Sequence, residues 1–159
     1  MPMGYMKLQS TRPQQRGFGL ADSPVGLAAW LYSLIQDAAQ HDGDVESVLA
    51  LDELIDNIMM YRLPNAGASA ARIYWEARKS MQQAPPRQKQ PTPAGISVFP
   101  GELSRLSRRW AEARFANIVH FNELDRGGHF AAWEVPALFV DEVRKTFRFA
   151  RQKTEGGTD

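Results

Sequence analysis

Residues 95–129 read GISVFPGELSRLSRRWAEARFANIVHFNELDRGGH, and this stretch decides the fold. Two short apolar runs, residues 96–99 and 118–121, are rich in residue types that favour strands. Between them lies an amphipathic segment that predicts a helix. The apolar positions of that helix are Leu103, Leu106, Trp110 and Ala113. A strand, a helix and a second strand at this spacing predict a parallel pair of strands.

A last helix is predicted to begin at Pro136. Its apolar stripe consists of Phe139, Val140, Val143, Phe147 and Ala150. Two strands alone do not make a stable sheet, and both runs have the composition of strands that are buried on each face. We therefore expect further strands to come from a missing amino-terminal half or from a partner chain.

The first half of the chain is predicted to be helical after a polar, loop-like opening, residues 1–22. Ser23 and Pro24 suit the N-cap and the first position of a helix, and apolar residues follow at helical spacing. Two further helices are expected over residues 51–61 and 68–81. The four tryptophans are expected in the core or in the apolar wall of a pocket; they are Trp30, Trp75, Trp110 and Trp133.

Proline and glutamine dominate residues 85–94, which predicts a surface connection. It separates a helical part, residues 1–84, from an α/β part, residues 95–152. A frayed tail is expected over residues 153–159.

The amino-acid composition of the chain limits the classes of function to be expected. Nineteen basic and eighteen acidic residues leave a net charge of +1, which gives no reason to expect nucleic acid or an anionic membrane as a partner. The chain has no cysteine, so thiolate chemistry is excluded and a reducing cytoplasm is the natural compartment. Its three histidines are scattered, so we expect neither a metal site nor a cofactor. No apolar run has the length of a membrane-spanning helix.

Two polar residues follow the predicted strands. Glu102 comes after the first strand, in PGEL, and His129 comes after the second, in ELDRGGHF. Ligands of parallel sheets bind beyond the carboxyl ends of the strands, and neighbouring strands lie about 4.8 Å apart. A carboxylate and an imidazole placed there form the orienting half of a nucleophile–histidine–acid triad. The alternative for each residue alone is a solvated loop side chain. Gly127 and Gly128 allow the backbone to turn tightly before His129.

Several segments, taken in order, resemble the later part of the epoxide hydrolases of the microsomal type, which have the α/β-hydrolase fold. The segments are GYMKLQSTRP, ADSPVGLAAW, LDELIDNIMMY, GASAARIYWE, VFPGEL and RGGHFAAWEVP. The resemblance runs from about residue 4 to residue 149. It implies a C-terminal part of the α/β-hydrolase fold, in which residues 1–84 are the remainder of a helical lid and residues 95–152 belong to the core.

The resemblance implies two-step hydrolysis of a small apolar epoxide to a vicinal diol, a detoxification chemistry. An aspartate attacks the epoxide and forms an alkyl-enzyme ester, which a histidine-activated water then cleaves. Carried over by motif, the base is His129 and the acid that orients it is Glu102. The tyrosines that protonate the epoxide oxygen are Tyr5, in GYMKLQSTRP, and Tyr74, in ARIYWE. Tyr32 and Tyr61 match no catalytic motif.

The sequence departs from the family pattern at the nucleophile. No aspartate elbow is found in it, and Asp125 follows the wrong strand, where it is expected to order the loop. We therefore expect a missing N-terminal half or a partner chain to carry the nucleophile, and a homodimer stays open. One alternative is an inactive fragment or a non-catalytic interaction remnant of the fold. A haloalkane dehalogenase is a second alternative, against which the paired tyrosines argue.

Overall fold

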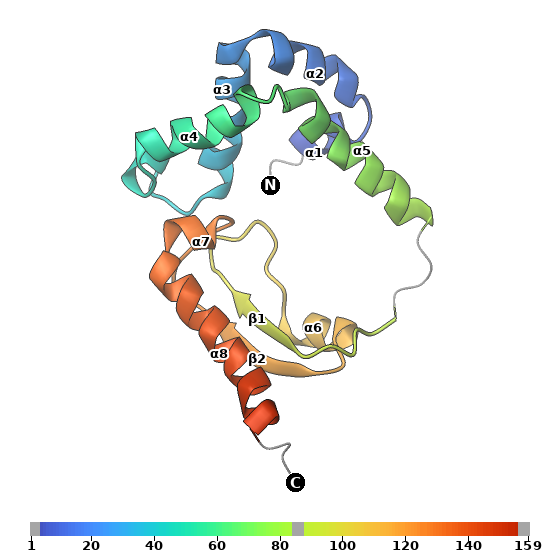
Figure 1. The fold of residues 1–159 in the computed structure, drawn as a ribbon, viewed down its shortest axis with the longest axis vertical. Helices are drawn as coiled ribbons and strands as arrows, with labels where there is room; N and C mark the ends of the chain where they lie inside the picture. The colour runs from blue at the N-terminus through green and yellow to red at the C-terminus, as the bar shows by residue number, and fades with distance from the viewer. Residues whose placement is uncertain (1–3, 84–87, 156–159) are drawn as a thin grey trace. The chain divides into compact units, whose positions relative to one another are not determined.

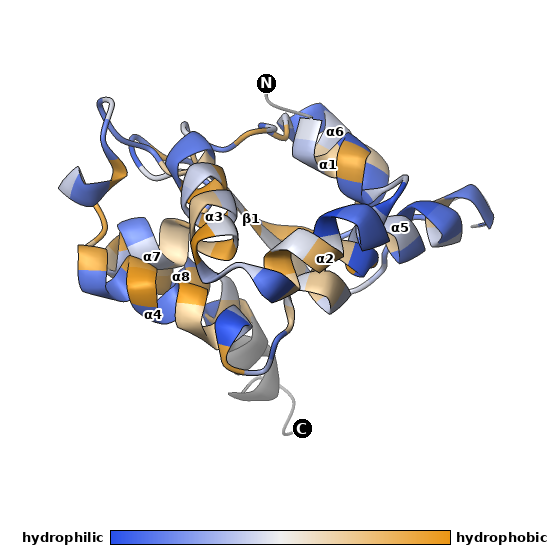
Figure 2. Cartoon of the chain, turned by 90° about the horizontal axis from the view of Figure 1, so that it is seen from above, coloured by the Kyte–Doolittle hydropathy of each residue, from blue (hydrophilic) through white to orange (hydrophobic). Residues whose placement is uncertain are grey.

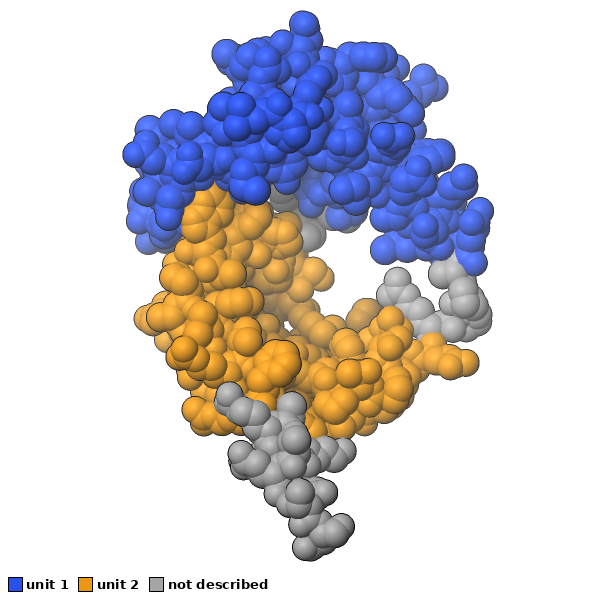
Figure 3. Space-filling view, viewed as in Figure 1, with its two compact units in different colours: residues 1–37, 41–86 blue, residues 38–40, 87–159 orange. Residues whose placement is uncertain are grey.

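The structure is a computed structural model of the 159-residue chain, and it describes residues 4–83 and 88–155. The chain divides into two compact units (Figure 1, Figure 3). Unit 1 consists of residues 1–37 and 41–86, and unit 2 consists of residues 38–40 and 87–159. Residue 84, residues 85–87 of the predicted connection and residues 156–159 of the predicted tail lie outside the described part.

Unit 1 is helical. Its elements are α1 (Gly4–Gln9), α2 (Pro13–Asp22), α3 (Pro24–Ala38, whose last residue belongs to unit 2), the short 3-10 helix η1 (Val45–Ser47), α4 (Leu51–Arg62) and α5 (Gly67–Gln83). The three predicted helices are confirmed as α3, α4 and α5. The Ser23 hydroxyl accepts a hydrogen bond from the Gly26 N–H at 3.0 Å, as expected of an N-cap that satisfies a free amide.

The prediction of a loop over residues 1–22 is wrong, because α1 and α2 form there. Pro13 occupies the first turn of α2, where its missing N–H costs nothing. Gly17 and Leu20, both buried in α2, pack against α5. A Cβ atom on Gly17 would lie 2.9 Å from the Cβ of Ala68, so glycine lets the two helices approach closely. Tertiary packing here outweighs the low helix propensity of glycine.

The core of unit 1 is built from apolar side chains of several helices. Apolar residues dominate α3, as Figure 2 shows. The buried apolar side chains in unit 1 include Leu20, Leu27, Ile35, Val45, Leu49, Leu54 and Ala71. The contacts of α5 with α2 and with α1 fix the positions from which α1 and α5 present their tyrosines.

Unit 2 contains β1 (Ala94–Val98), α6 (Arg108–Arg114), β2 (Ile118–Glu123), α7 (Ala131–Glu134) and α8 (Pro136–Glu155). The two strands pair in parallel, with Ile96 opposite Phe121 and Val98 opposite Glu123, so the predicted parallel pair is confirmed. The helix α8 contacts both strands (Figure 1). On α6, Arg108 lies 5.4 Å from the ring centre of Phe121.

Three expectations for unit 2 need correction. The helix predicted through Leu103 and Leu106 begins only at Arg108, since the Leu103 N–H is bonded to Glu102 Oε1 at 2.7 Å in a loop. Trp110 is 73% exposed and lies outside the core of the described structure. The last helix runs to Glu155, so the predicted tail begins later than residue 153. The short helix α7 had no periodic pattern to predict it.

A buried carboxylate holds α8 on the sheet. Glu142 is 2% exposed and accepts hydrogen bonds from four side chains. The donors are His120 at 2.6 Å, Lys145 at 2.9 Å, and Asn122 and Ser97, each at 3.0 Å. His120 and Asn122 lie on β2 and Ser97 on β1, so one side chain of α8 ties both strands. His120 therefore has a structural role in unit 2, through its bond to Glu142.

Replacing Glu142 with glutamine should lower the free energy of unfolding by on the order of 3 kcal/mol at neutral pH, since the carboxylate is a buried partner of charged and polar groups. Burial alone would raise the pKa of Glu142, but the hydrogen bonds from His120, Lys145, Asn122 and Ser97 lower it from 4.5 to about 2. A carboxyl with a lowered pKa in the folded state contributes stability above pH 4.5 and loses it as pH falls toward 2.

Urea unfolding of the chain between pH 7 and pH 2.5 measures this dependence. The variant Glu142→Gln should show a flatter pH profile than the parent below pH 4.5. Glu112→Gln is the matched control, because Glu112 pairs with Arg108 on the exposed surface. Parallel pH profiles for the parent and Glu142→Gln would contradict the role assigned to Glu142.

Among the described residues, no single helix is long and apolar enough to cross a membrane. The helices α2 and α3 meet that length and composition only as a pair, bent by 120° at their junction.

Candidate active site

The loops that follow β1 and β2 lie side by side, as the parallel pairing predicts. Gly101 and Gly128 form a parallel bridge beyond the ends of the strands, and the Gly101 N–H donates to the Gly127 carbonyl at 3.0 Å. Glu102 and His129 are the residues that follow these bridged glycines. The parallel pairing thus resumes beyond the strands, after a shift of register, and brings a carboxylate and an imidazole to the same edge.

His129 Nδ1 and Glu102 Oε1 are 2.9 Å apart. An ionised carboxylate only accepts hydrogen bonds, so Nδ1 carries the proton and donates a hydrogen bond to Glu102. The imidazole is then in the tautomer whose Nε2 has a free lone pair, which is the form of a base that accepts a proton from water. His129 is 46% exposed and Glu102 is 32% exposed, so water reaches the pair in this chain.

Two glycines let the backbone turn tightly just before His129. Gly127 has a φ of +101°, and a Cβ atom there would lie 2.7 Å from the Phe99 ring. A Cβ atom on Gly128 would lie 2.8 Å from the backbone nitrogen of Gln40. The expected tight turn before His129 is confirmed, because neither position accepts a larger residue without a shift.

Further residues hold the histidine loop, and the sequence did not predict them. The Glu134 carboxylate accepts hydrogen bonds from the N–H groups of Gly128 and Phe130, each at 2.8 Å. The Gln40 side chain accepts from the Gly127 N–H, and the His129 N–H donates to the Ala38 carbonyl at 3.3 Å. Glu134 lies within RGGHFAAWEVP and could have been found there. Gln40 is 87 residues from the glycine that it contacts and carries no signal in the sequence.

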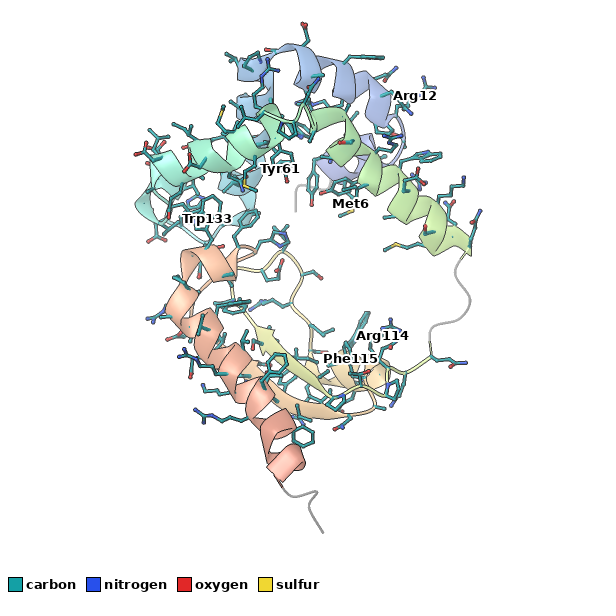
Figure 4. All side chains as sticks on the ribbon, viewed as in Figure 1. Met6, Arg12, Tyr61, Arg114, Phe115 and Trp133 are labelled. Atoms are coloured by element: carbon teal, nitrogen blue, oxygen red, sulfur yellow. The ribbon has the colours of Figure 1, made fainter. Side chains whose placement is uncertain are left out.

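Aromatic side chains pack beside the loop. The rings of His129 and Phe130 are 5.0 Å apart, and those of Phe130 and Trp133 are 6.3 Å apart, both edge to face. Trp133 projects from α7 in Figure 4. Its partly buried position is consistent with the apolar surroundings predicted for this tryptophan.

Tyr5 and Tyr74 form a second pair, within unit 1. Their rings are 5.8 Å apart and nearly perpendicular, with Tyr5 on α1 and Tyr74 on α5. Burial raises the pKa of Tyr74 above its ordinary value, and the neighbouring phenols of Tyr5 and Tyr61 raise it further. The Tyr74 hydroxyl therefore stays protonated at neutral pH and can donate a hydrogen bond.

The two tyrosines without a motif differ from each other in the structure. The Tyr32 hydroxyl donates to the Glu46 carboxylate at 2.9 Å, a surface contact apart from the tyrosine pair. Tyr61 on α4, which Figure 4 shows, is close enough to Tyr74 to affect its pKa. The sequence did not predict that Tyr61 lies near Tyr74, because LDELIDNIMMY shows only a helical pattern.

The four predicted side chains thus form two pairs, Glu102 with His129 and Tyr5 with Tyr74, one in each unit. In the described part of the chain, no group of three or more histidine, aspartate or glutamate side chains could hold a metal ion.

The sequence of the chain is similar to those of known proteins. No family model matches the chain. It is 51% identical over 150 residues to a protein of Stigmatella aurantiaca named "Putative epoxide hydrolase", with 94% of this chain and 33% of that protein covered. It is 33% identical over 158 residues to epoxide hydrolase 1 of Sus scrofa, with 94% of this chain and 35% of that protein covered.

Solved structures of epoxide hydrolases also superpose on the chain. The juvenile hormone epoxide hydrolase of the silkworm Bombyx mori superposes with a TM-score of 0.88 at 26% identity, covering 96% of this chain and 38% of that one. The epoxide hydrolase of Aspergillus niger gives a TM-score of 0.75 at 26% identity, covering 92% and 35%. The chain spans about a third of the length of the curated relatives that it matches.

The parallel strand pair, its covering helix and these structural neighbours define a class: the chain has the fold of the C-terminal part of an α/β-hydrolase. Within that class, the chain is homologous to epoxide hydrolases over 94% of its own length.

Proposed function

We propose that this chain supplies the acid, the base and the lid tyrosines of an epoxide hydrolase that converts a small apolar epoxide to a vicinal diol. The observation that carries the proposal is the 2.9 Å contact between Glu102 Oε1 and His129 Nδ1 at the carboxyl edge of two parallel strands. It is the arrangement that a histidine base requires for a fixed tautomer.

The first step opens the epoxide. An aspartate carboxylate attacks an epoxide carbon, the carbon–oxygen bond of the ring breaks, and an ester forms. The oxygen that leaves takes a proton from a tyrosine hydroxyl, either Tyr5 or Tyr74. A phenol with an ordinary pKa near 10 is a far stronger acid than the alcohol being formed, so this proton transfer is downhill.

The second step releases the diol. His129 Nε2 takes a proton from water, and the hydroxide adds to the ester carbonyl. The intermediate collapses, the diol leaves as an alcohol, and the aspartate carboxylate is restored. The proton on His129 returns through solvent to the tyrosinate left by the first step, so both side chains regain their starting forms. Glu102 stabilises the imidazolium that forms during proton transfer, because its carboxylate already accepts the Nδ1 proton.

We propose that the nucleophilic aspartate comes from a further segment or a partner chain that corresponds to the remaining length of the relatives. Exposed apolar side chains on α8 support this proposal, since they would be covered by such a segment. Phe139, Val140, Val143 and Phe147 are 37%, 41%, 39% and 62% exposed.

The test is a chimera in which this chain replaces its matching third of the Stigmatella aurantiaca relative. The chimera should convert styrene oxide to the vicinal diol at a rate within about tenfold of the unmodified relative, since the two sequences are 51% identical there. Chromatography of the diol measures the rate. A folded chimera without activity, beside an active relative, would favour a non-catalytic remnant of the fold.

A further inference from the structure

The backbone around His129 is bonded at every residue from Gly127 to Phe130. Four successive N–H groups donate to Gln40 Oε1, Glu134 Oε2, the Ala38 carbonyl and Glu134 Oε1, in that order. None of these acceptors belongs to Glu102. The loop is therefore fixed by contacts that are independent of the bond between the two catalytic side chains.

Glu134 is the centre of this arrangement. Its carboxylate accepts three backbone hydrogen bonds, from Gly128 and Phe130 on either side of the histidine and from Gln40 at 2.9 Å. Hydrogen bonds to an ionised acceptor are about twice as strong as those between neutral groups. Because both carboxylate oxygens accept, a carboxamide in the same place would direct an NH2 group at an N–H donor.

Gln40 completes the arrangement from a distant part of the sequence. Its N–H donates to Glu134 Oε2, while its side-chain carbonyl accepts from Gly127. The close packing of Gly101 and Gly128 against Gln40 leaves no room for another side chain at either glycine. The segment 38–40 is thereby held against both catalytic loops of unit 2.

We propose that Glu134 and Gln40 are positioning residues that hold His129 in reach of Glu102, so that Nδ1 stays the protonated nitrogen. The proposal rests on the function given above, in which His129 is the base. Glu134 touches the backbone on both sides of His129 and acts through it. A small rotation of this backbone would lengthen the 2.9 Å hydrogen bond between His129 and Glu102 and allow the other tautomer to form.

The experiment uses the full chain labelled with ¹⁵N-histidine, with no substrate. Long-range proton–nitrogen NMR spectra at a pH where the rings are neutral report which ring nitrogen carries the proton. The parent should show His129 with a protonated Nδ1. In Glu134→Gln this signature should be lost in favour of a mixture of tautomers, and the amides of Gly128 and Phe130 should exchange at least about tenfold faster with solvent.

His41 and His120 are internal controls in the same spectra. His41 is bonded to Gln36 and Gly43, and His120 to Glu142, so their signals should stay in place if the variant is folded. Glu112→Gln removes an exposed glutamate of α6 and should change none of the His129 signals. A folded Glu134→Gln chain with an unchanged His129 tautomer would overturn the proposal.

Gln40→Ala is the second variant, in case Glu134→Gln fails to fold. Gln40 is exposed, and its truncation removes only the acceptor of the Gly127 N–H while keeping its own backbone bond to Glu134. We expect at least about tenfold faster exchange at Gly127 and a partial loss of the Nδ1-protonated form. An unchanged His129 tautomer in this variant would also overturn the proposal. Since neither readout needs turnover, an inactive chimera would contradict the proposed function and leave this inference standing.

Discussion

The variant His129→Ala should slow the second step of turnover in the chimera and leave its first step intact. Ester formation needs the aspartate and the tyrosines, whereas ester hydrolysis needs a base for water. General bases contribute about 10²–10⁴-fold, so the steady-state rate of diol formation should fall by that factor. Mixing the variant with excess styrene oxide should give a protein whose mass is increased by that of one epoxide molecule.

The control for this variant is His41→Ala. His41 lies in the turn after α3, where its ring nitrogens bond to the Gln36 carbonyl and the Gly43 N–H. Its removal should leave the rate of diol formation unchanged. If His129→Ala turned over at the parent rate, or showed no increase in mass while it stayed folded, the role of His129 as the base would be wrong.

The variant Tyr74→Phe should slow the formation of the ester rather than its hydrolysis. Phenylalanine keeps the ring that packs at 5.8 Å against Tyr5 but removes the hydroxyl that protonates the epoxide oxygen. Loss of one hydrogen-bond donor to a developing oxyanion costs about 10²–10³-fold. A single-turnover experiment in a rapid-quench instrument separates the two steps by following the ester-bearing protein and the diol.

Tyr32→Phe is the matched control, because it removes a hydroxyl that donates to Glu46 on the surface. Burial and the neighbouring phenols raise the pKa of Tyr74, so it should lose its proton only at a higher pH than an ordinary tyrosine. Any alkaline loss of ester formation that is due to Tyr74 should accordingly begin at a higher pH than for an ordinary tyrosine. An equal slowing of both steps in Tyr74→Phe would contradict the assignment.

The sequence was sufficient for the parts of the structure that depend on local pattern. The two apolar runs became β1 and β2, and Ser23 caps α3. Parallel strands bring the residues that follow them to one edge, so Glu102 and His129 could be predicted as neighbours before any distance was known.

Other features depend on contacts between distant segments and left no local signal. The helix α2 forms in a polar segment because Gly17 packs against Ala68 on α5. Gln40 meets Gly127 only in the folded chain. The helix predicted to include Leu103 does not begin there for a local reason. The Leu103 N–H bonds to the Glu102 carboxylate, and the backbone stays in a loop.

The most direct test of the account is a double-mutant cycle on the rate of ester hydrolysis in the chimera, with Glu102→Gln, His129→Ala and the double variant. If Glu102 acts only by orienting and stabilising His129, its loss should cost about 10²–10⁴-fold with the histidine present and nothing once the histidine is absent. The double variant should then hydrolyse the ester at the same rate as His129→Ala. Independent effects that multiply in the double variant would contradict the claim that the two residues act as one unit.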